Sequence, residues 1–191
     1  MKTNFRKHKQ QGFTLLELGI VVTIALILVG VGVTKVPKIL ADNKSNSEIS
    51  ELPQIVTNTQ KAVANQQSYT GMTLDTLIRL DVFPQNRVTI PGAGAATATN
   101  RWNGPITFAA GTIATAGDIG RYVYSGVPAS ECKNVVMGVA QNFRRIFVDS
   151  ANSGTAGAGT AVKADGAVVD PVAVGTACTG AGSSITFDFA K

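Results

Sequence analysis

The chain has few of the residues that catalytic and metal sites require. Its 191 residues include one histidine and two cysteines, and only 15% of them are charged. The histidine, His8, lies among the basic residues of the first nine positions, outside any segment that we expect to fold. A histidine-based catalytic triad or a histidine-ligated metal ion is therefore not expected. We predict neither an enzymatic activity nor a cofactor.

The two cysteines, Cys132 and Cys178, are too few for a zinc cluster and too far apart for a CxxC redox pair. They suffice for one disulfide, which is typical of proteins that fold in an oxidising compartment. A bridge between them would enclose 45 residues, positions 133–177. Such a bridge would restrain the unfolded chain by roughly 4 kcal/mol.

Positive charge is concentrated at the N-terminus rather than over the whole chain. The formal net charge is +5, but four cations lie in the first nine positions. Without residues 1–12, 13 Lys and Arg face 12 Asp and Glu, a net charge of +1. The remaining basic clusters with aromatic neighbours are Arg144 with Arg145, and Arg101 with Trp102. Because nucleic-acid binding needs a larger basic surface, we predict no direct binding to nucleic acid.

A long apolar run follows the basic leader. Residues 18–34 contain no charge, and residues 13–34 contain only Glu17. As a helix, these 22 residues reach roughly 33 Å, enough to cross a bilayer core of about 30 Å. Basic residues precede the run, and only Lys35 and Lys38 follow closely, so the N-terminus is expected in the cytoplasm. We therefore predict a membrane-spanning helix with the rest of the chain outside the cytoplasm.

Two simpler explanations of this run are a cleaved secretory signal and a plain membrane anchor. A signal peptide is disfavoured because its apolar stretch usually has about 7 to 15 residues. A plain anchor does not explain Glu17, since a carboxylate in a membrane helix costs about 2.5 to 3.5 kcal/mol. Its nearest downstream cations, Lys35 and Lys38, are 18 or more residues away. The partner of Glu17 must come from another molecule or from a new N-terminus.

Residues 12–18 read Gly-Phe-Thr-Leu-Leu-Glu-Leu, between the basic leader and the apolar run. This combination resembles the processing signature of type IV prepilins. The resemblance implies that a membrane peptidase cleaves between Gly12 and Phe13, and that the new N-terminal residue, Phe13, is N-methylated. It also implies that Glu17 acts in filament assembly. A freed amine on Phe13 and the Glu17 carboxylate of a neighbouring copy would relieve each other's desolvation and set the axial register of the subunits.

The resemblance implies a structural function: a homopolymeric surface filament used in adhesion, aggregation, motility or DNA transfer. The implied partners are other copies of the chain, the inner membrane, prepilin peptidase and the pilus assembly machinery. Before assembly the protein would lie in the inner membrane with a cytoplasmic N-terminus and a periplasmic head, and afterwards in an extracellular pilus. The alternative functions are a minor pilin or a secretion-system pseudopilin and, more remotely, a membrane-anchored binding protein.

Features outside the N-terminus bear on the pilin subclass. The turn Trp102-Asn103-Gly104, the large cysteine-bounded region and the alternating strand at the C-terminus resemble type IVb major pilins. The leader of 12 residues and the start of the mature chain at Phe13 are closer to the type IVa subclass.

We expect four segments along the chain. Residues 1–12 are a leader peptide, residues 13–36 a transmembrane and filament-core helix, residues 37–64 its amphipathic continuation, and residues 65–191 a globular head. Pro37 and Pro53 are expected to kink or interrupt the helix, and residues 42–47 offer a break with a new start.

The head is expected to combine helices with short strands. Helices are predicted at residues 72–80, capped by Thr73, and at residues 128–143, with Pro128 in the first turn and Cys132 facing inward. Alternating or β-branched segments predict strands at residues 106–109, 121–125, 145–148 and 185–189. Residues 150–174, rich in Gly and Ala, are expected to form an exposed loop or a weak edge strand. The predicted fold class is α+β, with a long kinked N-terminal helix packed on an antiparallel sheet and one disulfide, as in the type IV pilin fold.

Overall fold

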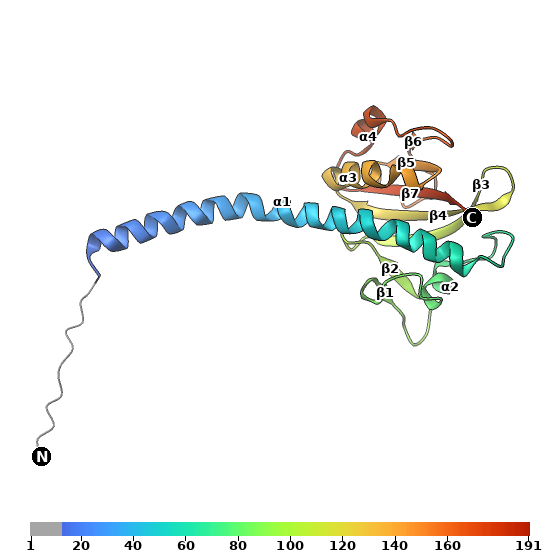
Figure 1. Cartoon of the computed structure of the whole chain (residues 1–191), viewed down its shortest axis with the longest axis horizontal. Coiled ribbons are helices and arrows are strands. Elements are labelled where there is room, and N and C mark those ends of the chain that lie inside the picture. Colours follow the sequence, from blue (N-terminus) through green and yellow to red (C-terminus); the bar gives the residue numbers. More distant parts are fainter. Residues whose placement is uncertain (1–12) are drawn as a thin grey trace, which may run out of the picture. The chain divides into compact units, whose positions relative to one another are not determined.

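The computed structural model describes residues 13–191 of the chain (Figure 1). The predicted leader, residues 1–12 with the cleavage residue Gly12, lies outside the described residues. The chain divides into two compact units after Leu40. One helix, α1 (Leu15–Ala62), begins in the first unit and ends in the second, Ala41–Lys191.

Helix α1 has 48 residues and is continuous. The predicted break at residues 42–47 is therefore wrong, and of the two effects predicted for Pro37 and Pro53, a kink or an interruption, the interruption is wrong. A proline inside a helix removes one backbone hydrogen bond, whereas helices in proteins are stabilised mainly by packing of an apolar face. Leu52 and Ile55, on either side of Pro53, are buried in the core of the second unit. This packing explains why the helix continues through Pro53.

The second unit contains a seven-stranded sheet in the order β1-β2-β3-β4-β7-β5-β6. Its strands are β1 (Val88–Thr89), β2 (Thr97–Thr99), β3 (Pro105–Thr112), β4 (Ala116–Val127), β5 (Arg145–Asp149), β6 (Thr160–Lys163) and β7 (Ser183–Ala190). All neighbouring strands are antiparallel. The four predicted strands are confirmed as parts of β3, β4, β5 and β7. The C-terminal strand β7 lies in the middle of the sheet, between β4 and β5.

One face of the sheet packs against the C-terminal half of α1. Tyr122 of β4 lies in register with Phe187 of β7, and both side chains are fully buried. The hydroxyl of Thr59 on α1 lies 2.7 Å from that of Tyr122, so a hydrogen bond joins the helix to the sheet. Further buried apolar residues are Leu52, Ile55 and Val56 of α1 and Val63, which directly follows the helix. The predicted α+β arrangement of a long helix on an antiparallel sheet is confirmed.

Three shorter α-helices complete the second unit: α2 (Leu74–Arg79), α3 (Ala129–Val139) and α4 (Pro171–Ala177). Thr73 caps α2 as predicted, because its hydroxyl accepts a hydrogen bond from the Thr76 amide at 3.2 Å. Helix α3 is shorter than predicted: Pro128 is its N-cap, and residues 140–142 form a 3₁₀ turn. Another 3₁₀ turn, Gln85–Arg87, precedes β1.

Residues 150–174 are more ordered than expected. They include the edge strand β6, which agrees with the predicted weak edge strand, and the start of α4. The backbone before β6 covers the polar face of β7: the amides of Gly154 and Gly157 donate to the hydroxyls of Ser184 and Thr186, both at 3.0 Å. Small residues permit this close approach, so the composition that suggested an exposed loop also suits a backbone that covers a sheet.

Candidate functional site

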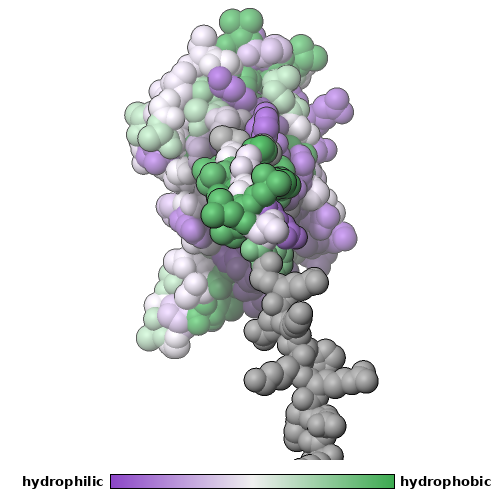
Figure 2. All heavy atoms as spheres, turned by 90° about the vertical axis from the view of Figure 1, so that its left-hand side faces the viewer, coloured by the Kyte–Doolittle hydropathy of each residue, from purple (hydrophilic) through white to green (hydrophobic). Residues whose placement is uncertain are grey.

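The first half of α1 is an apolar surface that the described chain leaves uncovered. An 18-residue window in this helix has a mean hydropathy of 2.6, and none of it is buried. By length and composition, α1 is long and apolar enough to cross a membrane. Figure 2 shows its apolar side chains as an exposed green cluster. The most exposed of them include Phe13, Leu15, Leu16, Leu26, Leu28 and Val33.

Glu17 lies in the first turn of α1, where its carboxylate is exposed. Its amide donates to the hydroxyl of Thr14 at 3.2 Å, and the amide of Leu18 donates to the Thr14 carbonyl. Thr14 thus caps the helix. The pattern Thr-x-x-Glu at residues 14–17 is that of a capping box, which the sequence analysis did not predict. Within residues 13–191, Glu17 forms no ion pair. The positive end of the helix dipole stabilises the negative charge of Glu17, and within the described residues the carboxylate is free to bind a cation.

A shallow apolar groove follows α1 beside Gly19. At Gly19 an added Cβ would have no neighbour within 4 Å. The hydroxyl of Thr23 donates to the Gly19 carbonyl at 2.8 Å, which satisfies the polar group of the groove. The groove is lined by Leu15, Leu16, Gly19, Ile20, Thr23 and Ile24. Small residues of this kind allow another helix to approach closely in an apolar environment.

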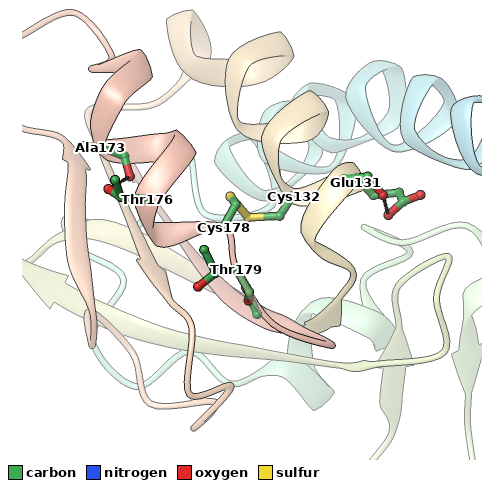
Figure 3. The surroundings of a disulfide bond; sticks show 8 residues. Glu131, Cys132, Ala173, Thr176, Cys178 and Thr179 are labelled. Atoms are coloured by element: carbon green, nitrogen blue, oxygen red, sulfur yellow. Dashed lines mark hydrogen bonds between the residues drawn. A yellow bond between two sulfur atoms is a disulfide. The ribbon is translucent and has the colours of Figure 1, made fainter.

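The predicted disulfide is present in the second unit (Figure 3). Cys132 lies in α3 and Cys178 directly follows α4, with their Cα atoms 5.7 Å apart. Both side chains are buried, as the inward position predicted for Cys132 requires. The bridge ties α3 to the segment that leads into the central strand β7.

Comparisons with known proteins cover both units. The family model described as "PilS N terminal" matches residues 42–189, and the model of the prokaryotic N-terminal methylation motif matches residues 7–33. The chain belongs to the type IV pilin family. No curated protein sequence matches this pilin.

A solved structure shows the same fold, and two others are similar to this pilin. The crystal structure of the type IVb pilin from Salmonella typhi aligns with a TM-score of 0.59 and 21% identity, and the match covers 76% of this pilin and 99% of that chain. An NMR structure of type IVb PilS from Salmonella typhi has a TM-score of 0.46, with 21% identity over 75% of this pilin and 96% of that chain. TcpA, a type IV pilin from Vibrio cholerae El Tor, has a TM-score of 0.46, with 16% identity over 74% of this pilin and 98% of that chain. The family and the fold are structural rather than enzymatic.

Arg144 and Arg145, which form one of the two basic clusters of the sequence, make ion pairs within the pilin. Arg121 and Arg145 bind the fully buried Asp188 at 2.6 and 2.8 Å. Hydrogen bonds to Asp188 raise the pKa of Arg121. Arg144 pairs with Asp165 at 2.7 Å. The two Asp188 contacts join β4 and β5 to β7, and the Arg144 pair joins the residue before β5 to the turn after β6, so these arginines have a structural function.

A buried ion-pair cluster of the pilin was missed by the sequence analysis. Arg87 donates to Glu48 and Glu51 of α1, at 3.0 Å in each case, and Arg101 donates to Glu51 at 2.7 Å. We call these four residues the Glu48 cluster. Glu48 and Leu52 are four residues apart, so they share the buried face of α1. A charged residue on the apolar face of an amphipathic helix was the sequence signal that could have predicted a buried ion pair.

Proposed function

We propose that this pilin is the structural subunit of a type IV pilus and polymerises with other copies of itself through α1. The observation that supports this most directly is the first half of α1, which is apolar, uncovered by the described chain, and begins with one unpaired carboxylate, Glu17. An exposed apolar surface of this kind is stable in water only when it is covered, by lipid before assembly and by other helices after assembly.

Processing would prepare this helix for assembly. Prepilin peptidase would cleave between Gly12 and Phe13, and Phe13 would be N-methylated, as the match to the methylation motif suggests. The amine of Phe13 would then pair with Glu17 of a neighbouring copy. Because each charge compensates the other in an apolar bundle, the pair would define the axial register of the subunits.

The two features of α1 point in different directions, which favours an open polymer. Glu17 and Gly19 are two positions apart, so their side chains lie about 200° apart around the helix axis. Glu17 would contact one neighbouring helix, and the groove beside Gly19 would contact another. Contacts through two different surfaces form open helical filaments when the rotation does not close.

This assembly implies where the protein lies before and after polymerisation. The precursor would lie in the inner membrane with a cytoplasmic N-terminus and a periplasmic second unit, and the assembled pilin would lie in an extracellular pilus. The pilus assembly machinery would extract it from the membrane. A disulfide and a compact second unit suit a major pilin exposed outside the cell. Quantifying this chain against all other pilins in sheared filaments would distinguish a major pilin from a minor one.

Intact mass and N-terminal sequencing of protein sheared from the cell surface test the processing. We expect a chain that starts at N-methylated Phe13 and lacks two hydrogens because of the disulfide. A chain that retains Met1 and stays with the membranes would contradict the proposal.

The substitution Glu17→Ala tests the assembly step. We expect the processed protein to accumulate in the inner membrane while surface filaments are lost, because the register pair cannot form. Asp42→Ala is the matched control, since Asp42 is an exposed carboxylate further along α1. Filaments should be counted by electron microscopy and subunits by immunoblot. Normal filaments in the Glu17→Ala strain would contradict the function assigned to Glu17.

A further inference from the structure

The Glu48 cluster attaches residues 85–101 to helix α1. Arg87 lies at the start of this segment and Arg101 at its end, and both bind carboxylates of α1. Arg87 also donates to the Thr99 carbonyl at 2.9 Å, which closes the segment on itself. Between them, β1 and β2 form a short hairpin with no other ion pair to the rest of the described chain. The cluster therefore supplies the ion pairs of this segment to α1, beside the pairing of β2 with β3 and the hydrogen bond from the Ala96 amide to Asp75 at 2.7 Å.

Glu48 is in an unusual environment for a carboxylate. Its side chain is fully buried, and only one of its oxygens, Oε1, accepts a hydrogen bond, from Arg87. The other oxygen, Oε2, is buried without a hydrogen-bond partner among the described residues, as are the hydroxyls of Ser45 and Tyr124. An ionised carboxylate in this position leaves a charged oxygen desolvated and unpaired, which is costly.

We propose that the Glu48 cluster is a proton-operated latch, in which a proton on Glu48 holds residues 85–101 against α1 and its loss loosens them. A protonated carboxyl group keeps one oxygen as the acceptor for Arg87. The neutral group carries no charge, so its buried second oxygen no longer leaves an ionised oxygen without a partner. The neutral form therefore satisfies the buried site better than the ionised form does.

The neighbouring charges act in both directions on this proton. Arg87 and Arg101 favour the ionised form of Glu48, whereas Glu51 and desolvation favour the neutral form. Tyr124, which lies beside Arg87 and Glu48, is neutral and offers only its hydroxyl. Burial is the largest effect, and the pKa of Glu48 is raised above its usual 4.5. When the segment opens, Glu48 meets water and returns to its ordinary pKa, so opening releases a proton and is favoured as the pH rises.

Solvent can reach the edge of the cluster. A groove of about 190 Å³ opens beside Glu51 and is lined on its other side by Asp81 and Phe83. Asp81 is therefore a further titratable group near the cluster. The latch concerns the second unit alone and does not depend on pilus assembly, so it can be tested on the full chain in detergent.

Hydrogen exchange of the full-length protein at several pH values tests the latch. After correction for the intrinsic exchange rate, we expect peptides from residues 85–101 to lose protection as the pH rises above 4.5. The change should reach at most about tenfold per pH unit, the limit for release of one proton. Peptides from β4 serve as the internal reference. Acrylamide quenching of Trp102, the single tryptophan of the chain, gives a second measure directly next to this segment.

Three variants make the test specific. Glu48→Gln mimics the neutral form, and its segment should be protected equally at all pH values. Glu51→Gln is the matched control: it should weaken protection at every pH but keep the pH dependence. Glu48→Leu removes the carboxyl group altogether and should also abolish the pH dependence. The proposal is overturned if the wild-type segment shows no pH dependence, or if Glu48→Gln or, where that variant does not fold, Glu48→Leu keeps the full dependence.

Discussion

At the scale of single residues, Gly104 shows how closely the turn before β3 packs on the sheet. Its amide donates to the Asn100 side chain and its carbonyl accepts from the Asn100 amide, both at 2.9 Å. A Cβ added to Gly104 would lie 1.7 Å from the carbonyl oxygen of Ser125. The turn at residues 102–104 is thus restricted to glycine at its last position by backbone atoms that cannot move easily.

We predict that Gly104→Ala lowers the free energy of unfolding by about 3 kcal/mol, because overpacking against the backbone displaces the turn. Denaturant unfolding followed by circular dichroism measures this loss. Gly92→Ala is the control, since nothing lies within 4 Å of its added Cβ, and it should change stability by less than about 0.5 kcal/mol. Equal destabilisation by the two substitutions would show that the Ser125 contact is unimportant.

At the scale of elements, the hairpin between β3 and β4 depends on one carboxylate. Asp118 accepts hydrogen bonds from the amides of Ala114, Ile113 and Thr115 at 2.7 to 3.1 Å. These bonds to Ala114 and Ile113 lower the pKa of Asp118 below its usual 3.8. A carboxyl with a lowered pKa stabilises the fold above its unfolded value, and this contribution is lost as the pH falls through the folded value.

We therefore predict that Asp118→Ala destabilises the protein near pH 7 and that the difference from wild type disappears below the folded pKa of Asp118. Urea midpoints at about pH 7 and about pH 2 measure both effects. Asp42→Ala, which removes an exposed carboxylate from α1, should change neither midpoint. A difference between Asp118→Ala and wild type that persists unchanged at low pH would contradict the charge-based explanation.

The disulfide is the second feature to be tested at this scale. Cys132 and Cys178 are separated by 46 positions, so the bridge removes substantial loop entropy from the unfolded chain. We predict that the double substitution Cys132→Ala and Cys178→Ala lowers the free energy of unfolding by roughly 4 kcal/mol. Guanidinium unfolding of the oxidised protein and of the double variant gives the comparison. Identical midpoints would mean that the bridge adds no stability.

At the scale of the whole molecule, the two units have different requirements. The second unit, Ala41–Lys191, contains the sheet, the disulfide and the buried half of α1. The first unit contributes a stretch of α1 with no buried residue in its apolar window. The core of the second unit is thus formed without the apolar half of the helix.

We predict that a chain beginning at Ala41 folds in water with the disulfide intact and unfolds cooperatively. Size-exclusion chromatography, near-UV circular dichroism and thiol titration test this expectation. The full-length chain should need detergent for the same behaviour, because its exposed apolar helix associates in water. A truncated chain that lacks fixed tertiary packing would contradict the independence of the second unit.

The prediction of this fold from sequence succeeded where the information was local. A run of uncharged residues, the methylation motif around Phe13, and alternating segments such as residues 185–189 each carry their signal within a few turns or one strand. The continuity of α1 through Pro53 was missed because tertiary burial outweighed a local preference. Strands β1 and β2 and helix α4 were missed because short segments of small residues have little periodicity.

The sequence by itself determined the class of this protein: its N-terminal helix, the family motif and the pair of cysteines need no tertiary contact to be recognised. The tertiary structure alone decided where β7 lies, which arginines bind Asp188, and that Glu48 is buried beside Arg87. These contacts join residues that are 39 to 67 positions apart. Long-range pairing of this kind depends on how separate elements pack together, and no local pattern in the chain specifies it.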